Sequence, residues 1–186
     1  LLMGSLFLGR RVLSLPKFIR EPILLAFSTA SSEAAYPKTL QGLKRFGCSE
    51  KISSFVLPVG YSFNLDGSMM YCTFATMFIA QAYGIEITIA QQITMLLLLM
   101  VTSKGMAGVP RASLVVIAAA MAQFHIPEAG LLLLLGVDHF LDMARSATNV
   151  MGNAIASSVV AKLEGELTEP TDDDEDLLDD AVLVKE

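Results

Sequence analysis

The long apolar segments of this chain are interrupted by short runs of polar residues, glycine and proline. Residues 52–83 are long enough to cross a bilayer, which takes about 20 residues, but the run Asn64-Leu65-Asp66-Gly67-Ser68 breaks them midway. Backbone that leaves the helix within the hydrocarbon is tolerated only where protein covers it or where it lines a cavity. A polar break inside an apolar span therefore points to a binding site in a membrane protein.

The composition supports the same class. The chain is 53% hydrophobic and 17% charged, whereas soluble domains are nearer a quarter charged. This argues against an ordinary cytosolic enzyme. We find no phosphate-binding glycine loop, CxxC pair or Ser/His/Asp constellation, so we expect no enzymatic activity, no cofactor and no nucleic-acid partner. Cys48 and Cys72 are expected to be inert, and His125 and His139 to be surface or packing residues.

Two further regions have a polar tip between two arms. In residues 12–51, an apolar arm leads to the tip at residues 28–33, and a basic amphipathic stretch follows. Neither arm approaches spanning length, so the sequence predicts a re-entrant hairpin with cytoplasmic flanks. In residues 85–126, the tip lies at residues 102–113. The spacing there fits two interpretations equally well: a second re-entrant hairpin, or two spanning helices joined by a loop.

Residues 129–163 form one long apolar helix candidate with a stripe of polar residues. At 100° per residue these side chains fall on one side of the helix. A charge at the bilayer centre costs at least about 2.5–3.5 kcal/mol, so such residues usually face a cavity and a partner. The simpler alternative is a structural ion pair between Asp142 and Arg145. The stripe consists of Asp138, Asp142, Arg145, Ser146, Asn149 and Asn153.

The basic residues indicate an orientation. Eight of the thirteen Lys and Arg residues lie between Arg10 and Lys51, which by the positive-inside rule places this region at the cytoplasm. Residues 1–11 are interpreted as the end of a transmembrane helix whose beginning is missing. Ten of the nineteen acidic residues lie in 164–180, and 164–186 is predicted to be an acidic, solvated cytoplasmic tail.

The charged groups also suggest a ligand. A guanidinium suits a side-chain carboxylate, and a carboxylate suits an α-ammonium group. Backbone N–H groups at hairpin tips and helix ends suit an α-carboxylate. Asn side chains and broken-helix carbonyls suit a hard cation or a proton relay. Together these groups match an acidic amino acid.

Four segments resemble the dicarboxylate/amino acid:cation symporter family, which includes bacterial proton- or sodium-coupled glutamate–aspartate carriers. They are SFNLDGS (62–68), FIAQ (78–81), TSKGMAGVPRAS (102–113) and DHFLDMARSATNVMGN (138–153), and the resemblance covers roughly residues 20–165. It implies an all-α, multi-pass inner-membrane protein and a homotrimer in contact with lipid. This chain would be the C-terminal transport domain, with two re-entrant helical hairpins, a broken helix and a polar-striped final helix.

The resemblance also implies residue roles. Arg145 would bind the substrate side-chain carboxylate and Asp142 the amino group. The remaining substrate contacts would come from Asn149, Ser146 and Ser68, and from the hairpin tips at Ser32, Val109 and Ser113. One cation site would include Gly60, Asn64 and Asn149, and another would include Ser62, Ser103 and Met106. Asp66 would serve a buried third cation or a proton. Beyond a possible Na⁺, no metal is implied.

Two positions depart from the sodium-driven pattern. Asn153 stands where sodium-driven members usually have Asp, which favours coupling to H⁺ over Na⁺. Glu33 follows only two serines in the first tip, so it is a candidate proton carrier or simply a residue that caps the tip. The expected function is symport of glutamate and aspartate by alternating access. The alternatives are a C4-dicarboxylate symporter, which usually lacks a carboxylate at position 142, and a non-transporting membrane interaction module.

Overall fold

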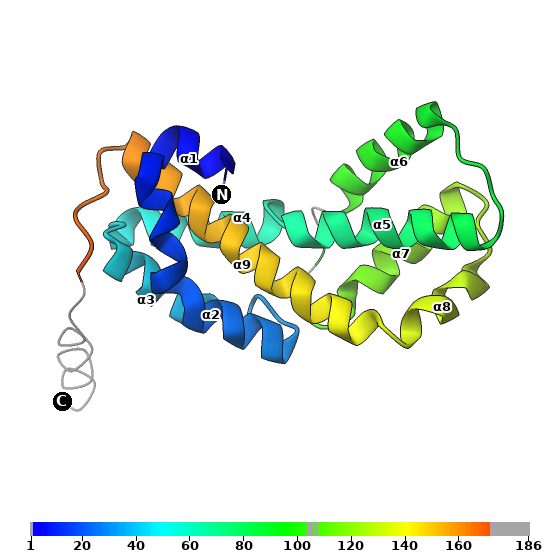
Figure 1. The fold of residues 1–186 in the computed structure, drawn as a ribbon, viewed down its shortest axis with the longest axis horizontal. Helices are drawn as coiled ribbons and strands as arrows, with labels where there is room; N and C mark the ends of the chain where they lie inside the picture. Colours follow the sequence, from blue (N-terminus) through cyan, green and yellow to red (C-terminus); the bar gives the residue numbers. More distant parts are fainter. Residues whose placement is uncertain (1, 104–105, 107, 172–186) are drawn as a thin grey trace.

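The computed structural model describes residues 2–103, 106 and 108–171, and its regular elements over these residues are all helices. The predicted all-helical class is confirmed. The body is elongated, with α9 (Asp138–Leu163) running along its middle (Figure 1). The helices of the first hairpin region, residues 15–46, lie in one half of the body, and the helices between residues 89 and 135 lie in the other. Residues 172–186 of the predicted tail lie outside the described residues.

The first hairpin region folds as two helices around a short tip. α1 (Leu2–Leu8) and η1 (Gly9–Leu13) lead into α2 (Leu15–Thr29), and α3 (Tyr36–Phe46) follows the tip. Ala30 ends α2 in the left-handed region at φ 49°, which turns the chain back. α2 packs against both α3 and α9. Leu15, Ile19, Leu43 and Phe46 are fully buried between these helices.

The next apolar segment is broken at the residues that the sequence singles out. α4 (Glu50–Phe63) ends at Asn64, and α5 (Asp66–Ala82) starts after Leu65. Asn64 (φ −118°, ψ 62°) and Leu65 (φ −101°, ψ 61°) both leave the helical region. Because α9 packs against both halves, the break is covered by protein.

The second hairpin region contains α6 (Ile89–Thr102) and α7 (Ala112–Gln123). A capping box between Thr88 and Gln91 starts α6, satisfying backbone N–H groups that the first turn leaves open. Both helices pack against α5. Their shared core includes Cys72, Ile79, Leu99, Ile117 and Met121.

The predicted single helix over 129–163 is wrong at its start. The structure has η3 (Glu128–Leu131), α8 (Leu132–Leu135) and then α9 from Asp138. Val137 leaves the helical region at φ −120°, next to Gly136, a poor helix former. Asp138 then begins α9 with a carboxylate, which the positive end of the helix dipole favours.

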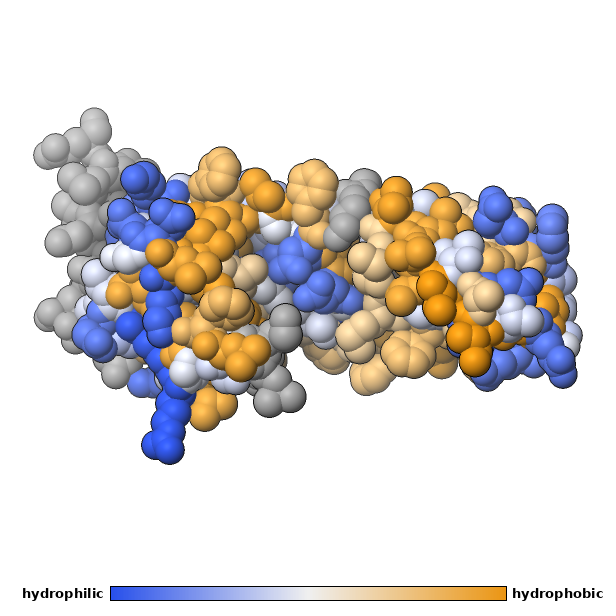
Figure 2. Space-filling model, turned by 90° about the horizontal axis from the view of Figure 1, so that it is seen from above, coloured by the Kyte–Doolittle hydropathy of each residue, from blue (hydrophilic) through white to orange (hydrophobic). Residues whose placement is uncertain are grey.

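Apolar residues cover much of the face in Figure 2, and polar residues gather toward its two ends and in one patch near its middle. Exposed large side chains include Phe55, Phe74, Phe78, Val115 and Phe140. Among the residues that the structure describes, no single helix has both the length and the apolar character to cross a membrane. The predicted spans at 1–11, 52–83 and 129–163 therefore stay predictions.

Residues 164–171 differ from the predicted solvated tail because they pair with the loop between α3 and α4. Ser49 N–H donates to the Glu166 carbonyl (3.1 Å), and Thr168 N–H to the Gly47 carbonyl (2.8 Å). Arg11 Nη2 donates to the carbonyls of Phe46 (2.8 Å) and Thr168. The acidic composition gives no indication of these contacts, because main-chain groups make most of them.

This pairing covers Cys48, which forms an isolated bridge with Leu167 and is 2% exposed. Burial raises the pKa of the Cys48 thiol, so its reactive thiolate is scarcer than usual at neutral pH. We expect Cys48 to resist a maleimide at pH 7 in the native protein and to react after denaturation. Labelling is read by mass spectrometry in a Cys72→Ala background; rapid native labelling contradicts the expectation.

Candidate functional site

The predicted polar stripe of α9 is buried. Asp138, Asp142, Ser146 and Asn149 have no exposed surface, Asn153 is 1% exposed and Arg145 2%. The stripe faces inward because α9 packs against α2, α4 and α5. Buried charges require partners, and the other elements supply them.

Arg145 is bonded on three sides. Its Nε donates to Asp142 Oδ1 (2.6 Å), Nη1 to Ser68 Oγ (2.9 Å) and Nη2 to the Val109 carbonyl (3.0 Å). The Asp142–Arg145 ion pair of the simpler alternative therefore exists. It is also the centre of a network that joins α9 to the start of α5 and to the second hairpin tip.

Asn149 holds the start of α5 against α9. Its Nδ2 donates to Ser68 Oγ (2.9 Å), and its Oδ1 accepts from Ser68 N–H (3.2 Å). The two helices cross closely here, since a Cβ on Gly67 would lie 2.4 Å from the Arg145 carbonyl oxygen. Gly67 therefore permits the approach that brings Ser68 to Arg145 and Asn149.

The two hairpin tips touch above this network. Ser31 Oγ donates to the Gly108 carbonyl (2.9 Å), and Gly108 N–H donates to Glu33 Oε1 (2.9 Å). A Cβ on Gly108 would lie 2.4 Å from Ser32 Oγ. Glu33 thus bonds to the other tip, and both of its interpretations, a proton carrier and a cap of its own tip, stay predictions.

Three buried hydroxyl groups around the site have no hydrogen-bond partner among the described residues: Ser32 Oγ, Ser113 Oγ and Ser146 Oγ. Buried polar atoms are nearly always paired in folded proteins. Hydroxyl groups left open beside a charged cluster are suited to a polar ligand.

A second group of polar residues meets at the break between α4 and α5. Asn64 Nδ2 donates to Asn153 Oδ1 (3.2 Å), and a Cβ on Gly60 would lie 2.3 Å from the same oxygen. A Cβ on Gly152 would lie 3.2 Å from Asp66 Oδ2. Gly60, Asn64, Asp66 and Asn153 thus come together, and Asn153 Nδ2 has no partner among the described residues. Asn149, predicted for the same cation site as Gly60 and Asn64, bonds to Ser68 instead, and Asp66 is exposed rather than at a buried site.

The other predicted cation group is brought together in part. Ser103 (3% exposed) and Met106 (6%) are both buried, and Met106 N–H donates to the Ser103 carbonyl (3.2 Å). Ser62 is exposed and donates to the Pro58 carbonyl (3.3 Å). Within the described ranges, no cluster of three or more His, Cys, Asp or Glu residues suits a metal ion.

No binding role is predicted from the sequence for Tyr71, Arg111 or the stripe residue Asp138. Tyr71 Oη donates to Asp138 Oδ1 (2.5 Å), and Arg111 Nε lies 3.6 Å from Asp138 Oδ2. Arg111 N–H donates to Asp142 Oδ2 (2.8 Å). The sequence places Asp138 one turn before Asp142, but it gives no signal for Tyr71.

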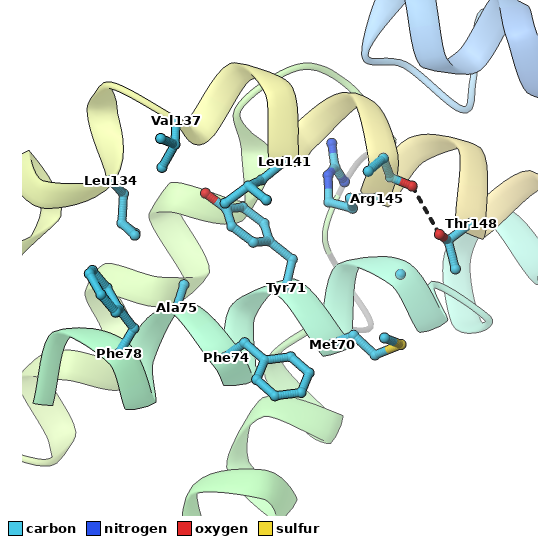
Figure 3. Close-up of a pocket in the computed structure, with 12 residues that line it drawn as sticks. Met70, Tyr71, Phe74, Ala75, Phe78, Leu134, Val137, Leu141, Arg145 and Thr148 are labelled. Carbon is cyan, nitrogen blue, oxygen red and sulfur yellow. Dashed lines mark hydrogen bonds between the residues drawn. The ribbon is translucent and has the colours of Figure 1, made fainter. Parts of the chain in front are cut away.

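Beside Arg145 lies an apolar cavity of about 470 Å³ between α5, α8 and α9. Tyr71, Phe74 and Phe78 line it from α5, and Leu134, Val137 and Leu141 face them (Figure 3). Asp142 and Asn149 do not line this cavity. Arg145 does line it, so the cavity borders the polar network at this one side chain of α9.

The fold and site together define a class: an all-helical protein in which two helical hairpins meet over a buried Asp–Arg–Asn network beside a broken helix. A family model described as the sodium:dicarboxylate symporter family matches residues 1–163. The chain belongs to this family, which confirms the resemblance read from the four segments.

Three curated relatives illustrate the match. The chain is 50% identical over 161 residues to the proton/sodium-glutamate symport protein of Geobacillus stearothermophilus, covering 87% of this chain and 38% of the relative. It is 50% identical over 156 residues to the proton/glutamate-aspartate symporter of Escherichia coli (strain K12), covering 84% and 36%. It is 45% identical over 154 residues to the C4-dicarboxylate transport protein of Bacillus subtilis (strain 168), covering 82% and 37%. The chain thus spans under two fifths of these relatives' length.

Proposed function

We propose that this chain forms the substrate- and ion-binding part of a secondary symporter for glutamate and aspartate. The observation that carries the proposal is the buried Asp142–Arg145 pair, which is bonded to both Ser68 and the second hairpin tip. The names of two relatives, a proton/sodium-glutamate symport protein and a proton/glutamate-aspartate symporter, support the same substrates. The protein is a transporter rather than an enzyme.

The present contacts of Arg145 and Asp142 indicate how a substrate would bind. Two N–H groups of the Arg145 guanidinium now donate to the Val109 carbonyl and the Ser68 hydroxyl. A substrate carboxylate would accept from both of them at once, in a stronger, bidentate pair. Asp142 Oδ2 accepts one main-chain N–H (2.8 Å), and the second lone pair of this oxygen can accept from a substrate ammonium group. The open hydroxyl groups of Ser32, Ser113 and Ser146 would receive the α-carboxylate. Closure of the hairpin tips would then seal the site for alternating access.

We further propose that the chain lies in the inner membrane as part of a homotrimer. α2–α3 and α6–α7 would be re-entrant hairpins, and the broken α4–α5 segment would span the bilayer together with α8–α9. The exposed apolar side chains of Phe55, Phe74 and Phe140 support contact with lipid or with neighbouring helices. The basic residues of 10–51 support a cytoplasmic flank, with the C-terminal tail on the same side.

Protons are the proposed coupling ion. Asn153 offers a neutral amide where Gly60, Asn64 and Asp66 converge, so this group carries one carboxylate. Glu33 joins the two tips through Gly108 and is the proposed proton carrier. Sodium is the alternative ion, since the name of the Geobacillus stearothermophilus relative includes both ions and the family description includes sodium.

Changing Asn153→Asp is expected to make uptake depend on sodium, because hard cations bind anionic oxygen ligands best. Uptake of labelled aspartate into proteoliposomes is compared with and without sodium at a fixed pH gradient. Asn153→Ser is the matched control, since it removes the amide without adding charge. Equal uptake by Asn153→Asp in both buffers contradicts a cation site at this position.

A C4-dicarboxylate symporter is the second candidate, since the Bacillus subtilis relative carries that name. Asp142 favours an amino acid, because a substrate without an ammonium group would leave the charge on this buried carboxylate uncompensated. Changing Asp142→Asn is expected to remove about 2–5 kcal/mol of aspartate binding free energy and to affect succinate much less. Calorimetry with both ligands measures the difference. Tighter wild-type binding of succinate than of aspartate supports the dicarboxylate carrier, and no saturable binding supports a non-transporting module.

A further inference from the structure

We propose that Arg111 and Asp138 form a clamp that holds the second hairpin tip on α9, and that Arg111 is a positioning residue for Asp142. The clamp rests on the proposed function in one respect, that Asp142 receives the substrate ammonium group. Neither Arg111 nor Asp138 belongs to the predicted substrate or cation sites. Their contacts connect the tip with both α5 and α9.

The side-chain half of the clamp follows from the burial of Asp138. This carboxylate has no exposed surface, and a buried carboxylate needs a partner for its charge. Tyr71 Oη satisfies Oδ1 (2.5 Å), whereas Oδ2 has no hydrogen bond from the described residues. Arg111 Nε lies 3.6 Å from Oδ2 and supplies the positive charge. The side chain of Arg111 is itself 59% exposed, so it covers the carboxylate from the solvent side.

The main-chain half follows from the conformation of Arg111. It has φ 62° and ψ 8° immediately before α7, a left-handed conformation that favours glycine. Non-glycine residues persist there when their surroundings hold them. In this conformation Arg111 N–H donates to Asp142 Oδ2 (2.8 Å). One residue is therefore attached to two carboxylates that lie one turn apart on α9.

The double attachment links hairpin position to the binding site. Asp142 is oriented by Arg145 Nε on Oδ1 and by Arg111 N–H on Oδ2. The clamp itself touches no predicted substrate group other than Asp142. Weakening the Arg111–Asp138 pair would therefore favour the open hairpin and let any substrate leave faster. Loss of the clamp should weaken aspartate and succinate binding by a similar factor, unlike Asp142→Asn.

The test uses the full-length protein with Cys48→Ser, Cys72→Ala and a reporter cysteine at Ala112, the first residue of α7. Maleimide labelling without substrate reports tip opening, and calorimetry gives the dissociation constants of aspartate and succinate. Arg111→Gly removes the charge while accepting the left-handed backbone, and Arg111→Lys retains the charge. Asp138→Asn and the double variant with Arg111→Gly complete a double-mutant cycle.

Arg111→Gly and Asp138→Asn are each expected to raise the labelling rate and both dissociation constants about tenfold, the effect of a moderate coupling. The double variant should be no worse than either single variant, and Arg111→Lys should restore most of the wild-type behaviour. The clamp is overturned if the fold-changes of the two single variants multiply in the double variant, or if either single variant labels at the wild-type rate. If Asp138→Asn fails to fold, the Arg111→Gly and Arg111→Lys comparison decides: equal behaviour overturns the clamp, and lysine rescue supports it.

The result separates the clamp from the proposed function. A wild-type protein that binds neither aspartate nor succinate contradicts the proposed function. Labelling of the reporter in the absence of substrate still tests the clamp in that case. Conversely, if the wild type binds normally and the labelling rate is the same in the Arg111 and Asp138 variants as in the wild type, the clamp alone is overturned.

Discussion

Uptake of glutamate and aspartate is expected to fall to background when Arg145 is replaced by alanine. The guanidinium is the positive charge at the centre of the buried network, bonded to Asp142, Ser68 and the Val109 carbonyl. Its removal takes away the cation that is proposed to bind the substrate side-chain carboxylate. It also leaves Asp142 buried without its partner, which costs about 3–5 kcal/mol of stability.

Proteoliposome uptake of labelled glutamate measures the effect, with thermal unfolding in detergent to separate loss of binding from loss of fold. Arg20→Ala is the matched control, because Arg20 is exposed on α2 and should leave uptake unchanged. Arg145→Lys should recover folding better than transport, since lysine keeps the charge but not the planar fork. Normal glutamate uptake by Arg145→Ala contradicts the substrate site proposed for this chain.

Gly67→Ala is expected to disrupt both binding and stability. The added Cβ would lie 2.4 Å from the Arg145 carbonyl and 2.8 Å from Thr148 Cβ, so α5 and α9 must move apart. Overpacking of this kind typically costs about 1–3 kcal/mol. The movement would also pull Ser68 away from Arg145 and Asn149, whose bonds to Ser68 Oγ are 2.9 Å each.

Thermal unfolding and aspartate titration of the same sample measure the two effects together. Gly136→Ala is the matched control, because a Cβ at Gly136 meets nothing within 4 Å. That control should retain the affinity of the wild type and unfold at no lower a temperature, because alanine is the better helix former. Gly67→Ala behaving like Gly136→Ala contradicts the close crossing of α5 and α9.

The buried face of α9 could be predicted because helical periodicity is a local property of sequence. Asp142 and Asn149 are seven residues apart, two turns of one helix, and both are fully buried. The break before Asp66 was likewise visible, since Asn-Leu-Asp-Gly-Ser interrupts an apolar run. Both features lie within one segment, where composition and spacing carry the information.

The contacts that build the site join distant segments, and composition does not encode them. Ser31 and Gly108 are 77 residues apart, and Tyr71 and Asp138 are 67 apart. The break at Gly136–Val137 is not predicted, because the surrounding leucines are typical of one continuous apolar helix. The pairing of 164–171 was missed because main-chain bonds, such as Thr171 N–H to the Arg45 carbonyl (2.9 Å), leave no side-chain signature.

The most direct test of the proposed function is uptake of labelled aspartate by the full-length protein in proteoliposomes. The buffer is sodium-free, the pH gradient is acid outside, and a parallel sample contains excess succinate. The proposed symporter predicts uptake that collapses with a protonophore, resists succinate and is lost in Arg145→Ala. Uptake that succinate abolishes, or that Arg145→Ala retains, contradicts an acidic amino-acid site at Asp142 and Arg145.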